Sequence, residues 1–521
     1  MKLNLLFSGL LIAGTMGSAF AQDTPDPTMT ARIRDEGLNH SQVMDIAFHL
    51  TDVSGPRLSG SPGLKRAQEW AVNQLKTWGM VNAKREAWGK FGKSWEITKS
   101  YAAITVPYYH AIIGIPKAWT PGTVGKVTGD VIYVKADTVT DLDKYKGKLK
   151  GKFIIVDAVA PAEQNFKTPD ASRYTEADLA KMAAAPPPAP AGGPPAGGRP
   201  GFGRGGAMMA RAALAKMALD ESAAMMLTQA RGTDGTVFTS GGQGYRDTAK
   251  LTAPEFETSA EDYQRILRLV KNGMKVTMEA DTKTEFKSDD LNEYDVVGEI
   301  PGTDPKLKEQ LVMIGGHLDS WHAATGGTDN AAGSAVMLEA MRILSRIGFH
   351  PRRTIRIALW SGEEEGLLGS RGYATNHFAD PADMVLKPEQ SKVSAYYNLD
   401  NGTGKIRGVY LQGNAAAGPI FKQWLAPFND LGATTITISN TGGTDHQSFD
   451  AVGIPGFQFI QDPMDYSTRT HHSNQDTYDK LSADDLKQAA TIIASFVYNT
   501  SQRDEMIPRK PLPAPRPARN R

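Results

Sequence analysis

Short apolar runs alternate with an amphipathic stretch along the C-terminal half of the chain. Apolar runs cover residues 310–314, 354–360 and 394–399, and a helical pattern spans 331–347 after the first run. Apolar runs of this length, alternating with helices, are typical of a mostly parallel sheet with helices on both faces. The pattern from Tyr294 onward therefore predicts an α/β fold.

The N-terminal half has two different patterns. Residues 40–80 contain two amphipathic stretches separated by the segment 54–63, which is rich in Gly, Ser and Pro, and this predicts a helix, a loop and a second helix. From about Pro116 to Pro254 the chain has short β-rich segments bounded by Gly, Lys and Asp turns. The predicted strands of this region lie within 124–134, 152–156 and 236–239.

These patterns divide the chain into parts. We expect a main α/β domain built from residues 22–115 and 255–502, interrupted by a β-rich insert over 116–254. Residues 183–207 are almost entirely Ala, Pro and Gly, a composition that cannot bury enough apolar surface to offset its ordering entropy, so they predict a disordered loop. The Pro- and Arg-rich segment 503–521 predicts a solvated, disordered tail.

Composition and the N-terminus limit the partners and the compartment. Lys and Arg number 58 against 57 Asp and Glu, so the basic excess of a nucleic-acid binder is absent and no nucleic-acid partner is expected. Lys2, the apolar run Leu5–Ala13 and the small residues at 19 and 21 predict a signal peptide over 1–21. The mature chain should be exported, periplasmic or secreted, without a membrane anchor; the sequence leaves its oligomeric state open.

Residues able to bind a metal follow the predicted strands. Cysteine is absent, so any metal must be held by His, Asp and Glu. The carboxyl ends of parallel strands lie along one edge of a sheet, so side chains that follow them should meet there. Two His and three carboxylates suit zinc. The polar residues from which such a set can be drawn are, in chain order, His317, Asp319, Asp329, Glu363, Glu364, Asp400 and either His471 or His472.

Each of these clusters also has a structural explanation when taken alone. A lone His after a strand is usually a packed residue, an Asp-Asn after Gly is a common helix N-cap, and a Glu triplet suits a helix start. Their joint appearance at successive strand ends favours catalysis. Two cations about 3.5–4 Å apart can activate a water and polarise a carbonyl, while a carboxylate that is not a ligand transfers the proton. The adjacent Glu363 and Glu364 can divide these tasks.

The motifs resemble those of the co-catalytic zinc aminopeptidases (clan MH), a family that includes bacterial secreted leucine aminopeptidases and plasma glutamate carboxypeptidase. They are GGHLDS, GGTDNAAG, WSGEEEGLLGS, NLD and HHSNQDT, with SGPRLSGSPG near the start. The resemblance implies a three-layer α/β/α, phosphorylase/hydrolase-like zinc exopeptidase domain with a mostly parallel central sheet. The segment KLKGKFIIV makes the insert similar to a protease-associated domain, which in relatives covers the site.

The resemblance also implies two zinc ions per chain. His317 and Asp400 match the ligands of one zinc, Glu364 and His472 those of the other, and Asp329 matches the bridging carboxylate.

Further roles follow from the same resemblance. Glu363 matches the general base, and Asp319 matches the carboxylate that orients the His317 imidazole. Asp445 and His446 belong to a segment similar to a family loop that lines the substrate pocket, and they are candidate substrate-binding residues.

One ligand position stays open between two neighbours. His471 stands where relatives often have Tyr, and either His471 or His472 can be the ligand. The spacing to Asp476 favours His472.

The implied activity is that of a metallo-exopeptidase, in first place an aminopeptidase that removes N-terminal residues from peptides. A carboxypeptidase or dipeptidase remains an alternative, because the same metal core serves both ends of a peptide. A glutaminyl cyclase, which uses one zinc on this fold, and a non-catalytic peptide-binding homologue are further alternatives. The complete ligand set and the intact Glu363 argue against both.

Overall fold

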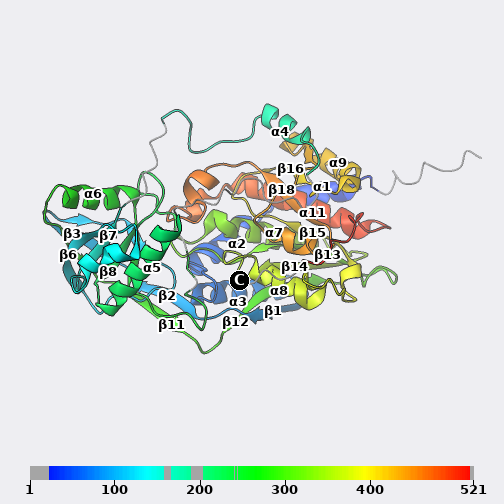
Figure 1. Ribbon diagram of the computed structural model, residues 1–521. Helices are drawn as coiled ribbons and strands as arrows, with labels where there is room; N and C mark the ends of the chain where they lie inside the picture. Colours follow the sequence, from blue (N-terminus) through cyan, green and yellow to red (C-terminus); the bar gives the residue numbers. More distant parts are fainter. Residues whose placement is uncertain (1–22, 158–165, 189–203, 240, 243, 517–521) are drawn as a thin grey trace, which may run out of the picture.

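The computed structural model describes residues 23–157, 166–188, 204–239, 241–242 and 244–516. The expected signal peptide and most of the Ala/Pro/Gly loop lie outside these residues. Figure 1 shows two lobes, a large one that holds most of the helices and a smaller one that includes α5 and α6. Within the described residues, no helix is long and apolar enough to cross a membrane.

The large lobe is built on a sheet of eight described strands. Four neighbouring strands in its centre, β14, β13, β15 and β18, are parallel, and β1, β12 and β16 add antiparallel pairings. In sheet order the strands are β1 (Val81–Lys90), β12 (Asn292–Ile300), β14 (Thr354–Trp360), β13 (Leu311–His317), β15 (Val393–Asn398), β18 (Gly456–Gln461), β16 (Ile406–Tyr410) and β17 (Thr435–Thr437). The α/β fold predicted from the alternating pattern is confirmed.

Helices cover both faces of this sheet because successive strand residues point to opposite sides. On β13, Val312 and Ile314 join the core under one helical layer, whereas Met313 joins the core under the other. The first layer contains α1 (Pro27–Asn39), α2 (Val43–Phe48), α3 (Pro62–Thr77), α7 (Ala332–Arg346), α9 (Gly418–Leu425) and α11 (Ala483–Gln502). The second contains α8 (Leu368–His377) and α10 (His446–Asp450).

The small lobe has its own sheet of eight described strands. In sheet order they are β4 (His110–Ala111), β3 (Ala102–Val106), β10 (Thr277–Ala280), β6 (Val127–Val134), β7 (Phe153–Val156), β8 (Met225–Gln229), β9 (Glu255–Thr258) and β5 (Gly114–Pro116). Helix α6 (Ala260–Lys271) packs on Phe153 and Ile155, and α5 (Arg204–Asp220) packs on Ile154 from the opposite face. The insert is therefore an α/β unit and not only β-rich.

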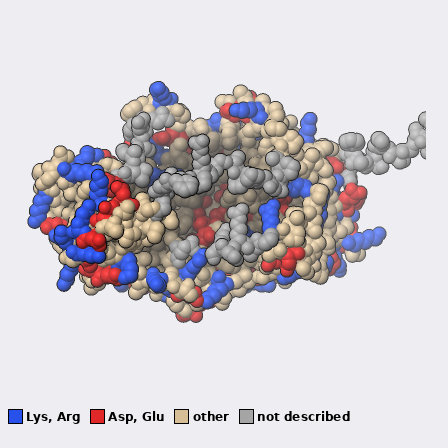
Figure 2. All heavy atoms as spheres, viewed as in Figure 1, with Lys and Arg blue, Asp and Glu red and all other residues tan. Residues whose placement is uncertain are grey.

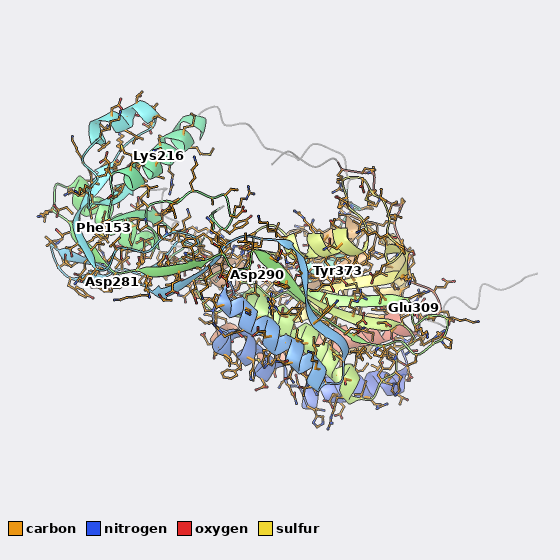
Figure 3. All side chains as sticks on the ribbon, turned by 90° about the horizontal axis from the view of Figure 1, so that it is seen from below. Phe153, Lys216, Asp281, Asp290, Glu309 and Tyr373 are labelled. Carbon is orange, nitrogen blue, oxygen red and sulfur yellow. The ribbon has the colours of Figure 1, made fainter. Side chains whose placement is uncertain are left out.

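The structure extends the second sheet beyond the expected insert. Strands at 102–116 and 255–280, most of which the sequence assigned to the main domain, belong to this sheet. The chain enters and leaves through a two-stranded ribbon of β2 (Ser94–Lys99) and β11 (Lys283–Lys287). Figure 3 shows this connection, with Phe153 on one side of it and Tyr373 on the other. A change of composition at two prolines does not reveal which sheet the flanking strands join.

Two expected segments pack differently. The C-terminal segment 503–516 lies on the main domain instead of extending into solvent: Arg503 pairs with Asp23 at 2.6 Å, and Ile507 is 1% exposed. Its arginines donate hydrogen bonds to backbone carbonyls and so attach the segment to the main domain. The composition alone, which is typical of a solvated tail, does not reveal this. Residues 236–239, expected as a strand of the insert, instead make an isolated bridge from Phe238 to Ser473 of the main domain.

Candidate metal centre

The ends of the parallel strands bring the candidate ligands together. His317 ends β13, Glu364 follows β14, and Asp400 follows β15, while Asp329 precedes α7. His317 Nε2 lies 3.3 Å from Asp329 Oδ1 and 3.3 Å from Asp400 Oδ1. His472, in the loop after β18, has Nε2 2.8 Å from Glu364 Oε2 and 3.3 Å from Asp329 Oδ2. Asp329 thus stands between the two imidazoles, with one oxygen toward each.

Several of these donor atoms are buried without a hydrogen-bond partner among the described residues. They are His317 Nε2, Asp329 Oδ2 and Glu364 Oε1. Buried polar atoms are normally paired, because an unpaired one loses its hydration without compensation. Nitrogen and carboxylate oxygen are the donors that zinc takes in the absence of thiolate, so this donor set fits such cations.

The geometry favours His472 over its neighbour. His471 Nε2 approaches Asp329 Oδ2 only to 3.8 Å, and its ring lies against that of His472, with 3.7 Å between ring centroids. His472 Nε2 makes the two closer approaches, to Asp329 and to Glu364. His471 lines the cavity beside these donors and stays within reach of Asp329.

Asp319 ties two parts of the site together. Its main-chain oxygen lies 3.0 Å from His317 Nδ1, and its Oδ1 lies 3.5 Å from the same nitrogen. Its Oδ2 accepts hydrogen bonds from Ser59 Oγ at 3.0 Å and from the Glu364 N–H at 3.3 Å. The residue therefore holds the His317 ring mainly through its backbone, while its carboxylate joins the loops of Ser59 and Glu364.

Asp476 supports the central carboxylate, a role that the sequence did not reveal. It accepts hydrogen bonds from the Thr328 N–H at 2.6 Å, from Thr328 Oγ1 at 2.8 Å and from the Asp329 N–H at 3.1 Å. Burial raises the pKa of Asp476 to about 7, and the nearby Asp329 carboxylate acts in the same direction. The sequence signal was its position four residues after His472.

Arg57 is a second residue whose part in the site the sequence did not reveal. It lies in the SGPRLSGSPG segment, is fully buried, and donates to Leu318 O at 2.6 Å and Gly326 O at 2.8 Å. It also binds the carbonyls of Leu50 and Thr325. Burial lowers the pKa of Arg57 to about 10, against the attraction of the site carboxylates. The guanidinium fixes the loop that joins His317 to Asp329.

Asp329, Glu364, Asp400 and His472 line a cavity of about 550 Å³. Glu363, which is 9% exposed, lines it together with Arg371, Tyr466 and Gln447. Figure 2 shows acidic side chains in the hollow between the two lobes. Arg371 and Tyr466 carry no pattern in the sequence that would have marked them as part of the site.

Asp445 and His446 do not line this cavity, contrary to expectation; Thr444 and Gln447 of the same segment do. His446 opens α10, is 1% exposed, and has its Nε2 3.2 Å from Thr441 O. Burial lowers the pKa of His446 to about 4, so the ring is neutral at pH 7. Asp445, which directly precedes the same helix, is fully buried.

Burial and the neighbouring carboxylates raise the pKa values of the two glutamates in the site. Burial raises the pKa of Glu363 well above its ordinary range, and Asp400 adds to the effect. Burial also raises the pKa of Glu364, with Asp329 adding to it. Buried like charges at this spacing must share protons or bind cations. The site therefore has the negative charge that a pair of divalent ions would neutralise.

A sheet whose strand ends carry His and carboxylates around a cavity defines a hydrolase of the metallopeptidase class. Residues 295–497 match Peptidase family M28, and this segment contains all five candidate ligands. This match, together with relatives that are named as peptidases, identifies the protein as a metallo-exopeptidase. The family resemblance inferred from the motifs is confirmed.

Individual relatives cover nearly the whole chain. Carboxypeptidase Q of Mus musculus is 27% identical over 465 residues, which make up 88% of this chain and 86% of the relative. A crystal structure of a peptidase M28 precursor from Shewanella amazonensis SB2B has a TM-score of 0.65 at 23% identity, covering 95% of this chain and 100% of its own. A zinc aminopeptidase from Bacillus subtilis has a TM-score of 0.53 at 18% identity, with 88% and 93% covered. The two solved structures share the fold.

Proposed function

We propose that this protein is a two-zinc aminopeptidase. His317 and Asp400 bind one ion, Glu364 and His472 bind the second, and Asp329 bridges them. The observation that carries the proposal is the position of Asp329, whose two oxygens each lie 3.3 Å from a different imidazole nitrogen. The unpartnered buried atoms of the same side chains support it. A structural neighbour bears the name zinc aminopeptidase.

The chain's own residues have separate tasks in this proposal. Two zinc ions would activate a water and polarise the scissile carbonyl. Glu363 lines the cavity next to the ligand Glu364, and it takes the proton from the attacking water and returns it to the leaving amine. Asp319 and Asp476 keep His317 and Asp329 in place through their hydrogen bonds.

The free amine of a substrate finds negative charge in the same cavity. Glu363 and Asp400 both line it, and both can attract an N-terminal ammonium group close to the reacting bond. A blocked N-terminus would lose this attraction and leave the carboxylates facing an amide. This asymmetry is the reason why we place aminopeptidase activity first.

A second candidate is an exopeptidase that requires a free C-terminal carboxylate, as a carboxypeptidase or dipeptidase does. Among the described residues, Arg371 is the arginine that lines the cavity. Guanidinium groups bind carboxylates in a bidentate manner. A relative that covers 88% of this chain is named Carboxypeptidase Q. A small cavity with acidic groups and one arginine would also suit a dipeptide with both ends free.

Four related substrates separate these candidates: leucyl-p-nitroanilide, a free dipeptide, its N-acetyl form and its C-terminal amide. An aminopeptidase cleaves the nitroanilide, the free dipeptide and the amide, but not the N-acetyl form. The reverse preference for the two blocked forms indicates a carboxypeptidase, and cleavage of the free dipeptide alone indicates a dipeptidase. Chelation should abolish activity and zinc should restore it; full activity after chelation would refute the metal mechanism.

We also propose that the chain is exported, and that the insert is of the protease-associated type and limits access to peptides. The N-terminal pattern supports export, and the contacts of the insert with His472, a residue that lines the cavity, support the second point. N-terminal sequencing of the mature protein tests export, with Gln22 expected first. Hydrolysis of short peptides without cleavage of folded proteins is the expected result for the insert.

A further inference from the structure

The loop that carries His472 is held by the insert at several points. We call residues 462–476 the His472 loop. Near its start, Met464 and Ser172 of the insert exchange two backbone hydrogen bonds of 2.8 and 3.0 Å. Further along, Arg469 binds Asp170 at 3.0 Å through Nε, and Asp234 at 3.0 Å through Nη2. Two separate insert segments therefore contact the same loop.

The closest contacts surround His472 itself. The Thr239 N–H donates to His472 O at 2.8 Å, and Thr239 Oγ1 lies 3.2 Å from the same oxygen. The Asn474 N–H donates to Val237 O at 3.2 Å, and Asn474 Oδ1 accepts from the Val237 N–H at 2.7 Å. Asn474 Nδ2 donates to Gly235 O at 3.1 Å. Residues 235–239, which we call the insert clamp, thus hold the carbonyl of the ligand itself and pair with Asn474, two residues further along.

The backbone of His472 needs such support. Its φ is +60°, in the left-handed region that residues with a side chain rarely adopt. Such conformations persist where the surroundings hold them. The Thr239 N–H fixes the carbonyl of this residue, and the ring of Trp321 lies edge-on to the imidazole at 6.0 Å. The direction of Nε2 toward Glu364 therefore depends on contacts outside the loop.

The other half of the centre is held within the main domain. Ser334 Oγ donates to His317 O at 2.7 Å, and Gln458 Nε2 donates to Asp400 O at 3.1 Å. Both ligands stand at or next to the ends of buried parallel strands. Among the ligands that serve one ion each, the insert clamp thus bears on His472 and not on His317 or Asp400.

We infer that the insert clamp positions His472, so that the insert sets the affinity of the cation site formed by Glu364 and His472. The inference rests on the proposed function, because it takes His472 as a ligand. Thr239 and Asn474 are positioning residues: they hold the backbone of the ligand loop and do not face the donor atoms. The insert is then part of the metal-binding structure and does more than cover the cavity.

Stepwise zinc titration of the metal-free full chain tests this, with metal content measured after gel filtration. The main variants are Asn474→Ala, which removes both side-chain bonds to the clamp, and Thr239→Pro, which removes the N–H donor. Loss of a contact that orients a metal ligand costs roughly 10–100-fold in affinity. We expect one site to weaken by about that factor, as in His472→Ala but less completely, while the other keeps its wild-type affinity.

The matched control is Asn272→Ala, which removes a hydrogen bond of 2.8 Å from Asn272 Nδ2 to Arg268 O at the end of α6. It should bind two ions with wild-type affinity. A variant that unfolds loses both sites, whereas the inference requires the loss of one. If Thr239→Pro unfolds, Thr239→Val removes the hydroxyl alone and should still weaken one site several-fold.

Wild-type affinity at both sites in Asn474→Ala and Thr239→Val would overturn the inference. A failure of the proposed function looks different. In that case the wild-type chain itself binds fewer than two ions, and His472→Ala leaves its zinc content unchanged.

Discussion

The two halves of the proposed metal centre are built in different ways. His317 ends β13 and Asp400 follows β15, and these two neighbouring strands of one buried sheet pair in parallel as far as Gly315 and Asn398. His472 lies in a loop whose backbone is paired with a segment more than 200 positions earlier in the chain. The first half has its geometry fixed by the core of the main domain, and the second by contact between two domains.

This difference separates global stability from metal affinity. Displacing a strand end requires disruption of packed core residues, so it cannot occur without a loss of folding free energy. The backbone at His472 and Asn474 can shift while both cores stay intact, because it is held by hydrogen bonds between the two domains. One half should therefore change with the stability of the main domain, and the other with the contact to the insert.

The largest effect should come from Glu363, which serves both halves without being a ligand of either. Glu363→Gln removes the proton acceptor but keeps the size of the side chain, so kcat should fall roughly 10²–10⁴-fold. Steady-state kinetics and metal analysis on the same sample check this. Two ions should remain bound. A parallel loss of zinc would show that Glu363 is itself a metal ligand. The division of the ligands into two halves would then be wrong.

Arg57 tests the half that depends on the main domain. Arg57→Met leaves several buried carbonyls without a donor, including those of Leu318 and Gly326, and should lower the free energy of unfolding by about 3–5 kcal/mol. Denaturant titration measures this change. Arg66→Met is the matched control, because Arg66 is exposed and binds one carbonyl, that of Ser54. The control should change stability by less than about 1 kcal/mol.

Equal values for Arg57→Met and Arg66→Met would show that the buried guanidinium does not fix the loop between His317 and Asp329. The clamp variants of the preceding section should behave in the opposite way. They should change zinc affinity and leave the unfolding transition of the main domain nearly in place.

The same difference explains what the sequence could predict. The apolar run 354–360 has the bounds of β14, and the helical pattern 331–347 differs from α7 by one residue at each end. Burial on both faces gives these elements a clear hydrophobic pattern, and parallel pairing then places the polar residues that follow them at one edge. The meeting of the candidate ligands could be foreseen for this reason.

The parts that could not be foreseen depend on polar backbone contacts between distant segments. Residues 236–239 have the composition of a strand, but nothing in that composition tells whether the partner is the insert sheet or the His472 loop. Arg57 was visible in a motif, yet its carbonyl partners come from folding. The limits of the insert depend on the pairing of β3 with β10, which have no distinctive pattern.

The free energy of unfolding should depend on pH through His377, which is not part of the proposed metal centre. Burial acts to lower the pKa of His377, but hydrogen bonds to Glu389 and Glu86, of 2.9 and 2.5 Å, outweigh it and raise the pKa to about 9. A raised folded-state pKa adds stability that is complete below the ordinary value of 6.5 and is lost as the pH rises through about 9. With allowance for partial exposure, the loss should be about 2 kcal/mol.

Denaturant titrations at pH 6 and pH 9.5 check this prediction. In His377→Gln the pH dependence of stability should become flatter by about that amount, while exposed His350→Gln should follow the wild type. Zinc content at pH 7 should stay at the wild-type value in both variants. A change in zinc content in His377→Gln would mean that the junction of β1 with α8 also controls the metal centre.

The smallest effect should come from the cap of α4 (Glu176–Ala183), which lies beyond the Met464 end of the His472 loop. Thr175 Oγ1 accepts from the Asp178 N–H, and Thr175→Ala should cost about 1 kcal/mol of local stability. Amide exchange in α4 should then become about fivefold faster, because its local opening takes less free energy. Thr175→Ser keeps the hydroxyl and should exchange as the wild type does.

Zinc affinity should not change in either variant, because residues 235–239 hold His472 without α4. A tenfold loss of affinity in Thr175→Ala alone would extend the clamp to this distant segment, and His472 would then depend on the whole course of the insert across the main domain.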